Sequence, residues 1–149
     1  MSKPIQKKIR IGSGAGYSGD RIEPAVELAE KGDLDYLVFE CLAERTIAIA
    51  LQNKRMDPEK GYDPLLEQRM AACLPVCHEK GITIITNMGA ANPVSAVEKT
   101  AATSRKLGLK GIKLGAVTGD DVMGLISRGE FEPMEGEGSL EGIMDRIVS

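Results

Sequence analysis

The sequence predicts an α/β protein whose sheet is mainly parallel. Short apolar runs rich in β-branched residues alternate with longer segments that repeat apolar residues at helical spacing. Helix start and stop residues, such as Asn92 with Pro93 and later Gly108, mark the boundaries between them. We expect four or five strands with helices on both faces, in a Rossmann-like three-layer arrangement. The alternative is a partial barrel.

The first half of the chain contains two expected strands and three expected helices. Residues 8–13 (KIRIGS) and 35–40 (DYLVFE) are the strands. The first helix is expected at residues 20–31, with Asp20 as its N-cap and Gly32 just past its carboxyl end. A second helix is expected up to the Asp57-Pro58 break, and a third from Asp63-Pro64 to Gly81.

The second half repeats the pattern. Residues 82–86 (ITIIT) are the third expected strand, and a helix follows from the Asn92 cap. Residues 111–117 (GIKLGAV) are the fourth expected strand, before a short helix that ends near Ser127. We therefore expect one domain over residues 1–128. Residues 129–149 are expected to form an acidic, glycine-rich connection and a terminal helix at 140–146, the start of a region missing from this chain.

The composition limits the class of protein. The net charge is -3, with 19 basic and 22 acidic residues and no basic block, so we expect no nucleic-acid partner and no membrane partner. The amino terminus lacks the apolar core of a signal peptide, which favours a cytoplasmic protein. Cys73 and Cys77 fall on an apolar helical stripe, so we expect buried thiols, with His78 turned away.

Four polar clusters follow the four expected strands directly. They occupy residues 12–20, 39–45, 86–93 and 117–121. Because the carboxyl ends of parallel strands meet at one edge of the sheet, where ligands bind in such folds, we expect the four clusters to form one site.

The first cluster fits the spacing G-x-G-x-x-G, with Gly14, Gly16 and Gly19 between a strand and a helix. Glu40 ends the second strand, where dinucleotide-binding folds place a ribose-binding carboxylate. However, Asp20 would put a negative charge where a pyrophosphate should bind. Dinucleotide binding, binding of another anion and a purely structural turn all stay open.

The second cluster holds Glu40, Glu44 and Arg45. One helical turn separates the two carboxylates, and Arg45 is close enough in sequence to pair with one of them. The alternative is that the acidic turn only complements the helix dipole. Cys41 has no histidine in a matching cluster to act as its base, which disfavours a nucleophilic role.

The third and fourth clusters supply amides and further carboxylates. Asn87 and Asn92 flank Gly89 and suit a carbonyl, amide or sugar group. Asp120 and Asp121 precede a helix, which one of them is expected to cap. Up to five carboxylates at one edge would be compatible with a divalent cation such as Mg²⁺, although the sequence identifies no cofactor and no set of metal ligands.

The segments GSGAGYSGDR, DYLVFECLAERT, ITNMGAANP and VTGDD also resemble the amino-terminal region of the acyclic terpene utilisation protein family, AtuA. The resemblance covers nearly all 149 residues. It implies the first part of a longer protein, and a role in the catabolism of citronellol- and geraniol-type terpenes through acyl-CoA thioesters. It implies no particular catalytic residue.

We therefore expect a metabolic enzyme, or part of one, that acts on a small organic acid or acyl-CoA and is completed by another segment or by oligomerisation. The alternatives are a non-catalytic ligand-binding or assembly subunit and a dinucleotide-binding domain. The expected acid/base groups are Asp20, Glu40 and Asp121. The expected substrate-binding residues are Gly14, Gly16, Tyr17, Gly19, Glu44, Arg45, Asn87, Gly89, Asn92 and Asp120.

Overall fold

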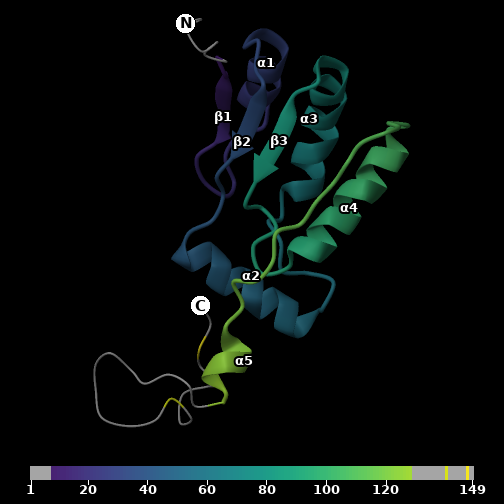
Figure 1. The fold of residues 1–149 in the computed structure, drawn as a ribbon. Coiled ribbons are helices and arrows are strands. Elements are labelled where there is room, and N and C mark those ends of the chain that lie inside the picture. Colours follow the sequence, from purple (N-terminus) through teal and green to yellow (C-terminus); the bar gives the residue numbers. More distant parts are fainter. Residues whose placement is uncertain (1–7, 129–139, 141–146, 148–149) are drawn as a thin grey trace, which may run out of the picture.

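The computed structural model describes residues 8–128, together with residues 140 and 147 (Figure 1). The described part alternates strands and helices, as the sequence predicts. The strands are β1 (Ile11–Ala15), β2 (Tyr36–Phe39) and β3 (Thr83–Thr86). The helices are α1 (Glu23–Lys31), α2 (Glu44–Met56), α3 (Leu66–Lys80), α4 (Pro93–Lys106) and α5 (Met123–Ile126).

The three described strands form one open parallel sheet in the order β1-β2-β3. Tyr36 is the register partner of Ile11 on one side and of Thr83 on the other. The α/β class and the parallel sheet are confirmed. The sequential order is shared by an arc of a barrel and by one half of a doubly wound sheet.

The expected fourth strand is not formed among the described residues. Residues 111–117 run back past β3 towards α5, but they make no ladder with it (Figure 1). Two features of the segment disfavour pairing. Gly111 has a left-handed φ of 76° and Gly115 has no side chain to pack, so the segment has little β preference. Val117 is 93% exposed, so its side chain adds little packing energy that could hold the segment against the sheet.

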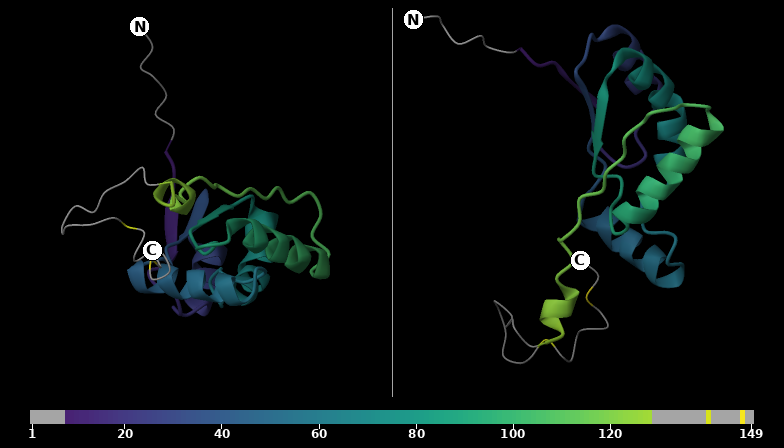
Figure 2. Two further views of the ribbon diagram at one scale, coloured as in Figure 1. Left: turned by 90° about the horizontal axis from the view of Figure 1, so that it is seen from below. Right: turned by 45° about the vertical axis from the view of Figure 1, so that its right-hand side comes forward.

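The described helices do not confirm the expected layers on both faces of the sheet. α1 packs on β1, α3 on β3, and α4 packs against α3 (Figure 2). Leu37 and Phe39 point into this helix-covered core, with 0% and 1% exposure. On the alternating positions, Ile11 and Ile85 are 67% and 52% exposed. These two side chains remain open to solvent in the described part.

The sequence predicts the start of α4 correctly, whereas α1 and α3 begin a few residues later than expected. Asn92 caps α4 as expected, and its Oδ1 accepts a hydrogen bond from the Ser95 amide at 3.4 Å. α1 begins at Glu23 rather than at the expected Asp20 cap, and Ile22 occupies its N-cap. α3 likewise begins at Leu66, because Asp63 Oδ1 closes a turn by accepting from the Leu65 amide at 2.8 Å.

Some expectations fall outside the described residues. The acidic connection after residue 128 and the terminal helix at 140–146 lie almost wholly there, so the predicted domain boundary stays a prediction. Within the described residues, no helix combines the length and the apolar character needed to cross a membrane.

Gly14 lies inside β1, where the sequence places it in a loop. A Cβ at this position would stand 2.5 Å from Cε1 of Phe39, a buried ring that cannot move away freely. We expect Gly14→Ala to lower the free energy of unfolding by about 1–3 kcal/mol. Gly16→Ala is the matched control, because a Cβ at residue 16 would meet no other atom within 4 Å. This substitution should change the free energy of unfolding by less than about 0.5 kcal/mol. Urea unfolding of both variants measures the difference, and equal values would contradict this packing.

Candidate functional site at the strand carboxyl ends

α2 crosses beneath the carboxyl ends of the strands (Figure 1). Between α2 and the loops that follow the strands lies a cavity of about 120 Å³, which we call the strand-end chamber. Ser18 lines it from the loop after β1, Cys41 from the loop after β2, and Asn87 from the loop after β3. Three of the four sequence clusters therefore meet around one cavity. The remaining lining residues are Leu42, Thr46, Ile49, Ala50, Asn53, Tyr62, Asp63, Pro64, Met88 and Ala90.

The first loop uses its own carboxylate to close itself. Asp20 Oδ2 accepts a hydrogen bond from the Gly16 amide at 3.1 Å, and Oδ1 accepts one from the Arg21 amide at 2.8 Å. These two bonds lower the pKa of Asp20 below its usual value. Asp20 thus occupies the Gly16 amide that an anion would use. Gly19 has the positive φ, 90°, that this turn requires, and Tyr17 points outward, 60% exposed.

The second and third loops are joined through Asn87. Its Nδ2 donates to Glu40 Oε1 at 2.9 Å, and its Oδ1 accepts from the Cys41 amide at 2.7 Å. The Leu42 amide also donates to Glu40 Oε1 at 3.0 Å. The hydrogen bond from Asn87, followed by that from Leu42, lowers the pKa of Glu40. Glu40 is therefore an exposed, ionised carboxylate held in a fixed orientation beside the chamber.

Four other residues that the sequence predicts to bind substrate lie in the loop after β3 or at the start of α2. Asn92 is buried, and its Nδ2 donates to the carbonyl oxygens of Pro58 and Lys60 at 2.8 and 2.7 Å. A side chain on Gly89 would lie 2.8 Å from Cα of Pro93, which explains the glycine there. Glu44 is the first residue of α2, and Arg45 forms no ion pair with either carboxylate of its cluster in the described part.

The fourth cluster separates into two parts. Asp121 Oδ1 accepts from the Met123 amide, 3.0 Å away, at the first residue of α5. Asp120 lines a second, larger cavity beside β3. Among the described residues, no three His, Cys, Asp or Glu side chains come together in a group that could hold a metal ion. The expected gathering of five carboxylates is not seen there.

Arg69 was missed by the sequence analysis, and it lies under all three loops. Its side chain is fully buried; Nη2 donates to the Asp20 carbonyl at 2.6 Å, and Nη1 approaches Cys41 Sγ at 3.1 Å and Met88 Sδ at 3.6 Å. The guanidinium stands 5.4 Å from the centre of the Phe39 ring, and Nε has no hydrogen-bond partner in the described part. Arg69 thus ties together the loops that build the chamber.

The three thiols are all free and buried, as expected for Cys73 and Cys77, but their surroundings differ. Burial raises the pKa of Cys73 to about 12 and that of Cys77 to about 11. Burial also raises the pKa of Cys41. The Arg69 charge opposes the rise at both Cys41 and Cys73, and at Cys41 the guanidinium also donates a hydrogen bond to the sulfur.

We expect Cys41 to be the first thiol alkylated as pH rises, because it lines a cavity and its Sγ has the Arg69 guanidinium 3.1 Å away. Cys77 also lines a cavity, but burial raises its pKa to about 11. Mass spectrometry of the native protein after short exposure to iodoacetamide, between about pH 7 and pH 10, identifies the modified cysteine. Cys41→Ser should remove the early adduct. Modification of Cys73 or Cys77 before Cys41 would contradict this account of the thiols.

These features define an α/β protein with an open parallel sheet and a small chamber at the carboxyl ends of its strands. The chain belongs to the acyclic terpene utilisation family, AtuA, whose sequence profile matches residues 9–149. The resemblance found in the sequence motifs is thereby confirmed. A search of curated proteins and a search of solved structures each gave no match.

Proposed function

We propose that this chain acts in acyclic terpene utilisation by holding a terpenoid acid, or its acyl-CoA thioester, at the strand-end chamber. The family description supports the metabolic context. The observation that carries the proposal is the meeting of three strand-end loops around one cavity, with the Asn87 amide in its wall and the Glu40 carboxylate beside it. An amide and a fixed carboxylate are groups that bind and transform an oxygen-bearing head group.

Glu40 is the proposed acid/base residue. Its lowered pKa makes it a proton acceptor rather than a proton donor near neutral pH. Only Oε1 of its carboxylate accepts hydrogen bonds from the described residues, which leaves Oε2 to face a ligand. Asp20 is proposed to support the first loop, since its carboxylate is engaged by the Gly16 and Arg21 amides. The proposal includes a cytoplasmic setting, a catabolic pathway and assembly with a second subunit.

Calorimetric titration of the full chain with citronellate, and with its coenzyme A thioester, tests the proposal. We expect saturable binding of at least one of them, and a change in the thioester that mass spectrometry detects. Glu40→Gln should keep the binding and lower turnover by about 100-fold or more. Loss of turnover with binding retained supports an enzyme. Binding without turnover in the unaltered chain favours the ligand-binding subunit, and no binding of either compound would refute the proposal.

A further inference from the structure

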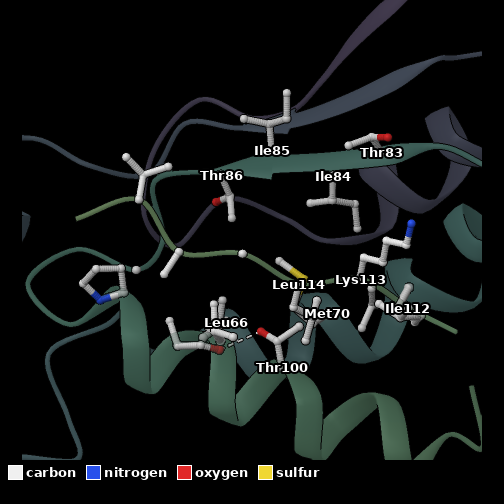
Figure 3. A pocket seen from close by; sticks show the side chains of 18 of the residues that line it. Leu66, Met70, Thr83, Ile84, Ile85, Thr86, Thr100, Ile112, Lys113 and Leu114 are labelled. Carbon is white, nitrogen blue, oxygen red and sulfur yellow. Dashed lines mark hydrogen bonds between the residues drawn. The ribbon is translucent and has the colours of Figure 1, made fainter. Parts of the chain in front are cut away.

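A cavity of about 780 Å³ lies between β3, α3, α4 and the extended residues 111–117 (Figure 3). We call it the β3 cavity. Its volume is within the range of sites that enclose small organic ligands. Apolar side chains from four parts of the fold form most of its wall. Among them are Leu66, Met70, Leu74, Ile84, Ala96 and Ile112.

The middle of the β3 cavity offers few groups for a polar ligand. From β3, Ile84 and Thr86 point towards α3 and α4, where Met70 and Thr100 lie opposite (Figure 3). The Thr100 hydroxyl already donates to the Ala96 carbonyl at 2.8 Å, and the Thr86 hydroxyl oxygen accepts from the Met88 amide at 3.0 Å. The Thr100 hydroxyl hydrogen is thus used within the protein, and apolar side chains surround both hydroxyls, so this region suits an apolar chain.

Charged groups lie towards the ends of the β3 cavity. The Lys113 side chain lies near Thr83, at the amino end of β3 (Figure 3). Asp120 lines the cavity beyond residues 111–117, after the extended segment has passed β3. The lining therefore changes from apolar in the middle to charged at both ends, with Lys113 near the amino end of β3 and Asp120 past the extended segment. The apolar middle matches the carbon chain of an elongated molecule.

The β3 cavity and the strand-end chamber adjoin. Leu42, Asn87 and Ala90 line both of them, so these three residues form the wall that the two cavities share. A head group beside Asn87 would therefore border the apolar cavity as well. We infer that the β3 cavity holds the acyclic, apolar carbon chain of a ligand whose carboxyl or acyl end lies at the strand-end chamber. This inference rests on the function proposed above and adds to it the site of the chain.

The test compares two carboxylic acids of different length on the full protein. Citronellate has ten carbons, and isovalerate has the same type of head group with five. Burial of the longer chain should lower the Kd of citronellate on the order of 100-fold relative to isovalerate. Ala96→Phe fills the cavity from α4 and should raise the Kd of citronellate about tenfold or more. Ala101→Phe, on the same helix but outside the lining, is its matched control.

A second pair of variants keeps the test independent of core packing. Leu114 lines the cavity and is 38% exposed, whereas Leu107 is 40% exposed and lies outside the lining. Leu114→Asp should weaken citronellate binding about tenfold and leave isovalerate unaffected, while Leu107→Asp changes neither Kd.

Equal Kd values for the two acids, unchanged by Leu114→Asp, would overturn the inference. Such a result would mean that residues 111–117 or another segment fills the β3 cavity, and the proposed head-group site would stand. If neither acid nor the thioester binds the unaltered chain, both proposals fail.

Discussion

Arg69→Ala is expected to lower the free energy of unfolding by about 3–5 kcal/mol, the largest loss among the substitutions considered. The substitution leaves a void in the centre of the core and leaves the Asp20 carbonyl without its donor at 2.6 Å. It also removes the cation beside the Phe39 ring. Removing the guanidinium recovers its own desolvation cost, so Arg69→Met, which refills most of the volume, should lose less.

Urea unfolding of the full chain measures these losses. Arg45→Ala is the matched control, because Arg45 is exposed and makes no ion pair in the described part; it should change stability by less than about 0.5 kcal/mol. If Arg69→Ala were as mild as Arg45→Ala, Arg69 would not be the tie between the three loops.

Asn87→Asp is expected to change the pH dependence of stability and to weaken acid binding. In the native chain, Asn87 Nδ2 donates to Glu40 Oε1 at 2.9 Å. A carboxylate oxygen in its place would face another carboxylate oxygen, so the pair would have to share a proton, and its pKa would rise. At a pH high enough to remove the shared proton, the second negative charge beside the chamber should weaken binding of a carboxylate ligand about tenfold or more.

The sign of the pH effect distinguishes this explanation from simple loss of a contact. The lowered pKa of Glu40 gives the native chain stability that is present above about pH 4.5 and is lost as pH falls further. A raised pKa acts in the opposite direction, so Asn87→Asp should be least stable near pH 7 and approach the native chain as pH falls towards about 5. Asn87→Ala lacks the repulsion and should show a deficit that does not shrink over this range. Parallel thermal unfolding curves for the two variants from pH 5 to pH 8 would contradict the shared-proton explanation.

Much of the fold could be predicted because its signals are local. The cap formed by Asn92 before Pro93, and the left-handed Gly81 that ends α3, depend on neighbouring residues alone. The buried stripe of Met70, Cys73 and Cys77 follows from helical spacing. Local signals could not decide whether residues 111–117 form the expected strand. Strand pairing there depends on how closely α4 lets the segment approach β3.

The candidate site was predictable in its location and less so in its interactions. Glu40 and Asn87 do interact across the strand ends, as expected for parallel strands. Asp20 closes a turn instead of capping a helix. An aspartate in this sequence context can do either, so the sequence could not distinguish the two roles. Arg69 carried a signal that was not used: it lies on the apolar stripe of α3, three residues after Leu66, where a charged side chain must be buried.

The central claim is that a terpenoid acid binds with its head at the strand-end chamber and its chain in the β3 cavity. The most direct test is an NMR titration of the isotope-labelled full chain with citronellate. We predict saturable shifts in the amides of Leu42 and Asn87 and in the methyl groups of Ile84 and Ile112, which line these cavities. Shifts confined to Ile11 and to other residues outside both linings, or no saturable shift at all, would contradict the claim.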